Sequence, residues 1–213
     1  LQVEGARGAF RVRLKDGRQL VAGTVVLAMG NSQLNTIEVP GADLPHVTYQ
    51  LNDPDEHEDK KVVVIGVGDA GIENALALGA RNEVTVANRG TDFPRAQVRN
   101  QELLHRAIQT GQIAHLTNAT IKRFAPRAAV FATNQGDVEV ECDLVIARMG
   151  ARPPTGFLKK VGLRLASDDP AAVPEVSETY ESTIPGVYVI GATAGYPLIK
   201  NCLNQGYEVV EHI

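Results

Sequence analysis

The fold is decided by residues 61–90, which read KVVVIGVGDAGIENALALGARNEVTVANRG. The wholly apolar, β-branched run at 62–65 is typical of a strand buried on both faces of a parallel sheet. A glycine turn follows at 66–71, then a helical run that ends at Gly79, and then a second apolar strand at 84–87. Strand, glycine turn, helix and strand within about 30 residues form the setting in which a GxGxxG pattern predicts dinucleotide binding.

Each glycine of this turn has its own predicted role. Gly66 permits the tight turn, Gly68 lets the backbone approach a pyrophosphate, and Gly71 allows the helix to pack closely on the strand. The free N–H groups around Asp69 and Ala70, at the positive end of the helix dipole, then face the phosphates. The alternative is a glycine-rich turn that only packs, but the complete frame favours binding.

Composition sets the outer bounds. With 213 residues, 44% of them apolar and 22% charged, the chain is expected to be soluble and globular, with one domain or two small ones. A net charge of −4 gives no electrostatic reason to expect nucleic acid. No apolar run approaches the roughly 20 residues of a membrane span, and no signal-peptide pattern is present. Because the chain starts at Leu1 and not at Met, we expect a cut-out or processed piece.

The two cysteines do not form a recognisable redox or metal motif. Cys142 and Cys202 lie 60 positions apart, which excludes a CxxC dithiol and a zinc knuckle. We expect both to be buried small apolar residues and not redox partners. This pattern fits a reducing cytoplasm. The five histidines show no HxxH or HxxxH spacing, so no metal site is predicted.

The N-terminal part of the chain is read as short strands followed by loop. Alternating patterns predict strands at 1–3, 9–14 and 19–22, with a hairpin turn at Asp16-Gly17, and another strand at 24–30. The acidic run at 52–60 could pass for a metal site. A short solvated helix is the better interpretation, because Asp53 is placed as the N-cap, Pro54 follows at the first helical position, and carboxylates favour a helix start.

The region after the central unit alternates between helix and strand. Residues 99–110 predict an amphipathic helix closed by Gly111, and residues 113–116 a third parallel strand. The remaining predicted elements are a small antiparallel insert at 121–124, 128–132 and 138–140, strands at 142–147 and 187–190, and a helix at 198–213.

Several strands of this chain run into glycine, as VVLAMG (25–30), LVIARMG (144–150) and VYVIGATAG (187–195) show. With these motifs the chain resembles the two-dinucleotide-domain flavoproteins, in particular thioredoxin reductase-like pyridine nucleotide oxidoreductases. The family's TxxxxATG-like strand matches 24–30, and its PG crossing matches 39–41. Its nicotinamide-domain GxG and following glutamate match Gly66, Gly68 and Glu73. Its closing strand-to-glycine element matches 143–153, and its TxxPGVYxIGD segment matches 183–191 up to the last letter.

The resemblance implies an α/β fold with a Rossmann-like three-layer nicotinamide domain, made of a parallel sheet and a small antiparallel insert. That domain is assigned to 43–152, and partial FAD-domain segments are assigned to 1–42 and 153–213. The implied cofactors are NADP (or NAD) and, in a full-length parent, FAD. The parent would pass hydride from NAD(P)H to FAD and electrons on to an unidentified acceptor. A homodimer is one option for its oligomeric state.

Three departures from the family pattern qualify this expectation. The family's own flavin-binding GxGxxG is absent from these residues, so we expect the piece to be flavin-free and inactive alone. Ala192 stands where an acidic residue normally bonds the flavin ribityl chain, a contact worth on the order of 1.5–3 kcal/mol. The redox CxxC is replaced by a cysteine-free stretch at 46–60, which excludes exchange through a resident dithiol.

The turn and the resemblance together predict the cofactor-binding residues. They are Gly66, Gly68, Asp69, Ala70, Gly71, Glu73, Asn88, Arg89, Arg95, Gly150, Gly191, Lys200 and Asn201. No catalytic side chain is predicted, because hydride chemistry belongs to the cofactors. The resemblance places Lys200 and Asn201 near the flavin pyrimidine ring; a surface lysine and a capping-type asparagine are the alternative.

The second strand of the nucleotide unit ends in Asn88-Arg89-Gly90, without the carboxylate that accepts from a ribose 2′-OH in NAD-binding proteins. Arg89 at this tip, followed by Arg95 and Arg99, favours a 2′-phosphate and hence NADPH. The functional prediction is the NAD(P)H-binding part of a flavin-dependent oxidoreductase. The alternative is a non-catalytic dinucleotide-binding or regulatory module that retains only the fold.

Overall fold

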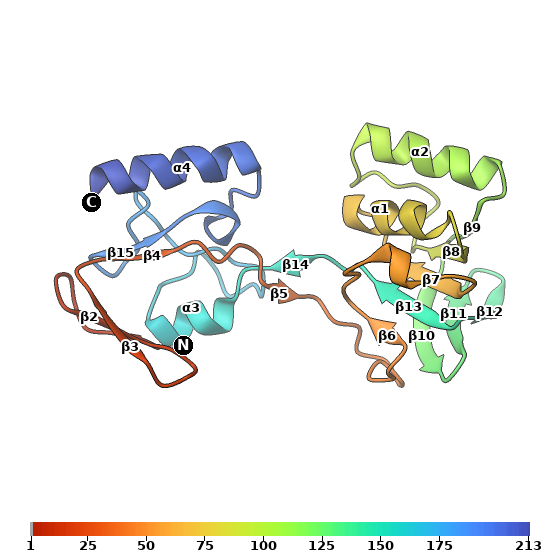
Figure 1. The fold of residues 1–213 in the computed structure, drawn as a ribbon, viewed down its shortest axis with the longest axis horizontal. Coiled ribbons are helices and arrows are strands. Elements are labelled where there is room, and N and C mark those ends of the chain that lie inside the picture. Colours follow the sequence, from red (N-terminus) through yellow and green to blue (C-terminus); the bar gives the residue numbers. More distant parts are fainter. Residues whose placement is uncertain (1) are drawn as a thin grey trace. The chain divides into compact units, whose positions relative to one another are not determined.

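The computed structural model describes residues 2–213, so Leu1 of the first predicted strand lies outside the described residues. Two compact units are present (Figure 1). The central unit is Asn35–Gly150. The discontinuous unit combines the stretch that ends at Leu34 with Ala151–Ile213. The assignment of these parts of the chain to nicotinamide and flavin binding stays a prediction.

A five-stranded parallel sheet with the order β6-β13-β7-β8-β9 forms the middle of the central unit. Its strands are β6 (Val47–Thr48), β7 (Lys61–Ile65), β8 (Glu83–Ala87), β9 (Ile113–Leu116) and β13 (Leu144–Ala147). The strands at 62–65, 84–87 and 113–116 lie where the apolar runs predict them. The two-residue strand β6 was not predicted.

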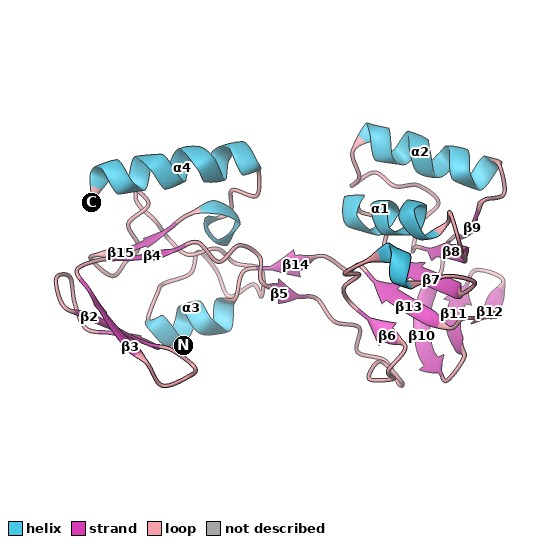
Figure 2. Cartoon of the chain, in the orientation of Figure 1, coloured by secondary structure: helices cyan, strands magenta, loops and turns pink. Residues whose placement is uncertain are grey.

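Both faces of this sheet are covered, which explains its continuous apolar runs. On one face, Val62 and Val64 pack with helices α1 (Asp69–Leu78) and α2 (Val98–Gln109). On the other face, Val63 and Ile65 pack with Phe131 of an antiparallel sheet. That sheet consists of β10 (Thr120–Ala125), β11 (Ala128–Thr133) and β12 (Gly136–Glu141). Figure 2 shows these three layers, which confirm the predicted α/β class and the antiparallel insert.

The discontinuous unit holds an antiparallel meander and two short strand pairs. The meander consists of β1 (Gln2–Glu4), β2 (Phe10–Arg13) and β3 (Gln19–Ala22). The pairs are β4 (Val25–Leu27) with β15 (Val187–Val189), which are parallel, and β5 (Gln33–Leu34) with β14 (Ala151–Arg152), which are antiparallel. The helices are α3 (Thr155–Val161), η2 (Gly191–Ala194) and α4 (Ile199–His212).

The turn signals of the sequence are placed as predicted, with one refinement. Gly17 has φ +86 in the turn between β2 and β3. The predicted short helix after Asp53 is a 3₁₀ helix, η1 (Pro54–Glu56), and the Asp53 carboxylate accepts from the Asp55 N–H at 2.9 Å. Arg81 forms ion pairs with Asp55 and Glu58 at 3.4 and 3.3 Å, so two carboxylates of the acidic run are paired with an arginine. Among residues 2–213, no group of three acidic, histidine or cysteine side chains could hold a metal ion.

In the described part of the chain, no helix combines the length and the apolar character that crossing a bilayer requires.

Candidate dinucleotide-binding site

The turn between β7 and α1 is too tightly packed for side chains at its first and third glycines. Gly66 has φ +100, and a Cβ there would lie 2.4 Å from the Arg148 carbonyl oxygen. A Cβ on Gly71 would lie 2.0 Å from the Gly66 carbonyl oxygen. Both distances are far below van der Waals contact, so the close packing predicted for Gly71 is present.

The second glycine has different surroundings. Gly68 has φ −78, an ordinary value, and a Cβ there would meet no protein atom within 4 Å. It is the N-cap of α1, and no side chain bonds the free N–H groups of the first helical turn. The missing side chain therefore leaves open space in front of a helix N-terminus, which fits a pyrophosphate.

The carboxylates of Asp69 and Glu73, both predicted to bind the cofactor, form hydrogen bonds that link α1 to α2. Asp69 Oδ1 accepts from the Gln97 backbone N–H and from Asn100 Nδ2, each at 2.8 Å. Asn100 Nδ2 also donates to Glu73 Oε1 at 3.1 Å. Asp69 and Glu73 thus hold the start of α2 against α1. The remaining predicted residue of this helix, Ala70, is exposed.

Asn88 closes the loop that follows β8. It is only 8% exposed, its Nδ2 donates to the Asp92 carbonyl at 3.1 Å, and its Oδ1 lies 2.8 Å from His115 Nε2. Its backbone N–H donates to Leu116 O, and its carbonyl accepts from the Ala119 N–H. Both ends of its amide are thus used inside the protein, where they shape the loop. A contact between Asn88 and the coenzyme stays a prediction.

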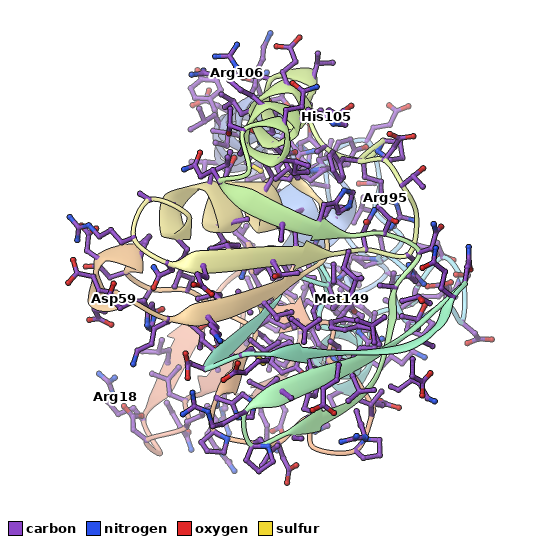
Figure 3. All side chains as sticks on the ribbon, turned by 90° about the vertical axis from the view of Figure 1, so that its right-hand side faces the viewer. Arg18, Asp59, Arg95, His105, Arg106 and Met149 are labelled. Carbon is purple, nitrogen blue, oxygen red and sulfur yellow. The ribbon has the colours of Figure 1, made fainter. Side chains whose placement is uncertain are left out.

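Three exposed arginines follow β8 in the sequence. Arg89, Arg95 and Arg99 are all exposed, and none makes an ion pair within residues 2–213 (Arg95 is labelled in Figure 3). The nearby Asp92 carboxylate instead accepts from the Thr91 hydroxyl at 3.5 Å. Among the described residues, these three guanidinium groups therefore remain available for an anionic ligand.

His115 supports the loop from β9. Phe93 is 1% exposed, and its ring centroid lies 4.9 Å from that of His105 and 5.1 Å from that of His115. Since Asn88 Nδ2 donates to Asp92, Oδ1 is the atom facing His115, and His115 Nε2 is the donor. Burial lowers the pKa of His115, His105 lowers it further, and Asp92 opposes the change.

Replacing His115 by glutamine is expected to make stability less sensitive to acid. Because the pKa of His115 is lowered by folding, the unfolded chain takes up the proton first as the pH falls below about 6.5. This contribution to wild-type stability is therefore complete above that pH and is lost below it. Urea unfolding near pH 7.5 and near pH 5.5 should show a larger loss for wild type than for His115→Gln. Equal losses of unfolding free energy in the two proteins would contradict a lowered pKa of His115 in the folded state.

The other predicted residues lie at strand and helix ends. Gly150, at the end of the central unit, has φ +79, and its carbonyl accepts from the Asn35 N–H at 3.1 Å. Gly191 has φ +67, and its N–H donates to the buried Gln205 Oε1 at 2.7 Å. Lys200 is exposed and Asn201 is half-buried in the first turn of α4, whose N-cap makes no side-chain bond. The glycine turn, the arginines and Gly150 thus lie in the central unit. The discontinuous unit contains Gly191, Lys200 and Asn201.

Both cysteines are free thiols. Cys142 is fully buried, as predicted, and burial raises the pKa of its thiol to about 11, with Asp143 and Glu141 adding to the effect. Cys202 is only half-buried, and its thiol donates to the Tyr196 carbonyl at 3.4 Å. The prediction of burial is therefore correct for the first cysteine and only partly correct for the second.

Residues 1–191 match the family described as pyridine nucleotide-disulphide oxidoreductase. The chain belongs to this family. The resemblance predicted from the strand-to-glycine motifs is therefore confirmed at the level of the family.

The relatives that this chain resembles are reductases with different named partners. The chain is 30% identical to bacilliredoxin reductase Bdr of Bacillus subtilis (strain 168), over 75% of this chain and 50% of that protein. It is 25% identical to a ferredoxin–NADP reductase of Paraburkholderia xenovorans (strain LB400), over 96% of this chain and 60% of that protein. Among solved structures, bacillithiol disulfide reductase Bdr from Staphylococcus aureus superposes with a TM-score of 0.90 and 26% identity. That superposition covers all of this chain and 68% of the other. The chain thus spans about half to three fifths of these curated relatives.

Proposed function

We propose that this chain is the NAD(P)H-binding part of a flavin-dependent oxidoreductase and that it prefers NADPH. The observation that carries the proposal is the open space at Gly68, in front of the uncapped N-terminus of α1. A Cβ would fill this space without meeting any protein atom, so glycine leaves room there for a ligand to approach the backbone. Three N–H groups and the helix dipole suit the negative charge of a pyrophosphate there.

The arginines at the end of β8 support the choice of NADPH. Arg89, Arg95 and Arg99 are exposed and form no ion pair within the described residues, and Arg89 lies two positions after the strand at whose end coenzyme selection takes place. A charge-assisted contact with a 2′-phosphate is worth on the order of 1.5–3 kcal/mol, which is about a tenfold to hundredfold change in affinity. Asn88 and His115 contribute by holding the loop that carries Arg89.

The proposed reaction of the whole protein moves hydride from NADPH to FAD and electrons onward. Accepting the hydride is the chemistry that the flavin supplies when bound. The contribution of this chain is to bind and orient the coenzyme with the turn at Gly66 to Gly71. The first turn of α4 has no side-chain cap and contains Lys200 and Asn201. Its free N–H groups and the lysine cation would stabilise negative charge that develops on the bound flavin.

The relatives are named as reductases of different partners, bacilliredoxin in one case and ferredoxin in the other. Residues 1–213 contain no CxxC, and Cys142 is a buried thiol with a raised pKa. We therefore propose electron transfer that does not pass through a dithiol in this part of the protein.

A non-catalytic dinucleotide-binding module is the second candidate. It is favoured by one observation, Ala192, which cannot accept a hydrogen bond from a ribityl hydroxyl through its side chain. Visible flavin absorbance of the full-length protein, bleached by NADPH, would exclude this candidate. A colourless full-length protein that still binds NADPH would support it.

Replacing Arg89 by alanine is expected to weaken NADPH binding tenfold to a hundredfold and to leave NADH binding unchanged. The reason is the loss of a guanidinium from the 2′-phosphate, a group that NADH lacks. Titration calorimetry with both coenzymes measures the effect directly. Arg106→Ala is the matched control, since Arg106 is an exposed arginine in the last turn of α2. Equal affinity of wild type for the two coenzymes, unaltered by Arg89→Ala, would overturn the assignment.

A further inference from the structure

Arg148 is built into the glycine turn by its backbone. It follows β13, which lies next to β7 in the sheet. Its N–H donates to the Ile65 carbonyl at 2.7 Å, and its own carbonyl occupies the space beside Gly66. Its Cβ lies 3.5 Å from the position that a Cβ on Gly71 would take. The residue therefore contacts two of the three glycines that form the proposed pyrophosphate site.

The charged side chain of Arg148 makes few bonds to the rest of the described protein. It is half-buried, and its Nη1 donates to the Tyr49 carbonyl at 2.8 Å. That is the single protein bond of a group with five N–H donors, counting partners within residues 2–213. No carboxylate in the described chain forms an ion pair with it. A half-buried cation without an anion carries a desolvation cost that an anionic ligand would offset.

The order of the sheet indicates which part of a ligand this cation would meet. From β7, the chain continues to β8 and β9 on one side, while β13 and β6 lie on the other. Ligands of such sheets bind across the carboxyl ends of the strands, at the point where the strand order reverses. The ribose that carries the 2′-group lies at the end of the second strand, here β8, and the pyrophosphate lies at α1. The other half of the dinucleotide therefore extends toward β13 and β6, where Arg148 and Tyr49 lie.

We infer that Arg148 binds the nicotinamide 5′-phosphate half of the coenzyme. This inference rests on the proposed function and extends it from the adenosine side, where Arg89 lies, to the opposite side of the strand-order reversal. The bond to Tyr49 O holds the guanidinium over the end of β6, and its remaining N–H groups are donors for phosphate oxygen. Arg148 is then a second selector, for an intact dinucleotide over an adenosine fragment.

The test compares two ligands that differ in this half. NADPH contains the nicotinamide 5′-phosphate, whereas 2′,5′-ADP ends at the adenosine 5′-phosphate. In titration calorimetry, Arg148→Met is expected to weaken NADPH about tenfold to a hundredfold and to change 2′,5′-ADP less than about twofold. Arg89→Ala should weaken both ligands, and Arg106→Met should weaken neither.

A second variant separates the charge from the bond to Tyr49. Arg148→Gln can still donate to the Tyr49 carbonyl but carries no charge, so it should lose NADPH affinity as Arg148→Met does and retain the wild-type melting temperature. Wild-type NADPH affinity in Arg148→Gln, or an equal loss of both ligands in Arg148→Met, would overturn the inference and leave Arg148 a support of the turn. If the wild-type protein binds neither ligand, the proposed function fails and this inference falls with it.

Discussion

Replacing Gly68 by valine is expected to abolish NADPH binding and to leave the fold intact. A Cβ at this position meets nothing within 4 Å, and φ is −78, so the backbone here accepts a side chain without strain. The same Cβ would project into the space where a pyrophosphate has to meet the backbone. Calorimetry should detect no binding, while the melting temperature should stay within about 8 °C of wild type, since an N-cap change costs at most about 1–2 kcal/mol.

A graded series makes this result specific to the site. Gly68→Ala adds a single methyl group and should weaken binding less than Gly68→Val. Ala77→Val places the same branched side chain on an exposed position of α1 and should bind NADPH as wild type does. Undiminished binding by Gly68→Val would mean that the pyrophosphate lies elsewhere, and the proposed function would lose the observation that carries it.

The parallel sheet was predictable because strands buried on both faces appear in the sequence as uninterrupted apolar runs. The strands β7, β8 and β9 lie within a residue of the predicted runs. β7 and β8 consist mainly of β-branched residues, and a glycine follows the first and an asparagine the second. The strands β5, β6 and β14 were missed. Each has only two residues, and each exists because a partner from a distant part of the chain lies beside it. No local periodicity can report such a pairing.

The site shows the same limit. The three glycines were predicted from spacing, because the turn is local. The roles of Asp69 and Asn88 were not predictable, because their partners lie about 30 residues further along the chain, at Asn100 and His115. The only sign of Arg148 in the sequence is a cation at the end of an apolar strand. Its place beside Gly66 depends on β13 lying next to β7, which only the sheet order reveals.

Replacing Gly71 by alanine is expected to destabilise the central unit strongly. The new Cβ would lie 2.0 Å from the Gly66 carbonyl oxygen, and no side-chain rotation can relieve this contact because the backbone fixes the positions of both atoms. Either α1 moves off β7, or the turn with φ +100 at Gly66 opens. Overpacking of this kind costs about 1–3 kcal/mol, and more when backbone is displaced. A loss of about 3 kcal/mol corresponds to a melting temperature lower by roughly 6–12 °C.

The matched control is Gly206→Ala, the same substitution within helix α4. A Cβ on Gly206 meets nothing within 4 Å, so only helix propensity changes there, and alanine should stabilise that helix by up to about 1 kcal/mol. Two chemically identical mutations in two helices are thus expected to shift the melting temperature in opposite directions, because the Gly66 carbonyl lies against one glycine and open space against the other. Equal shifts would show that the close approach of α1 to the turn does not limit stability, and that Gly71 is not required for packing.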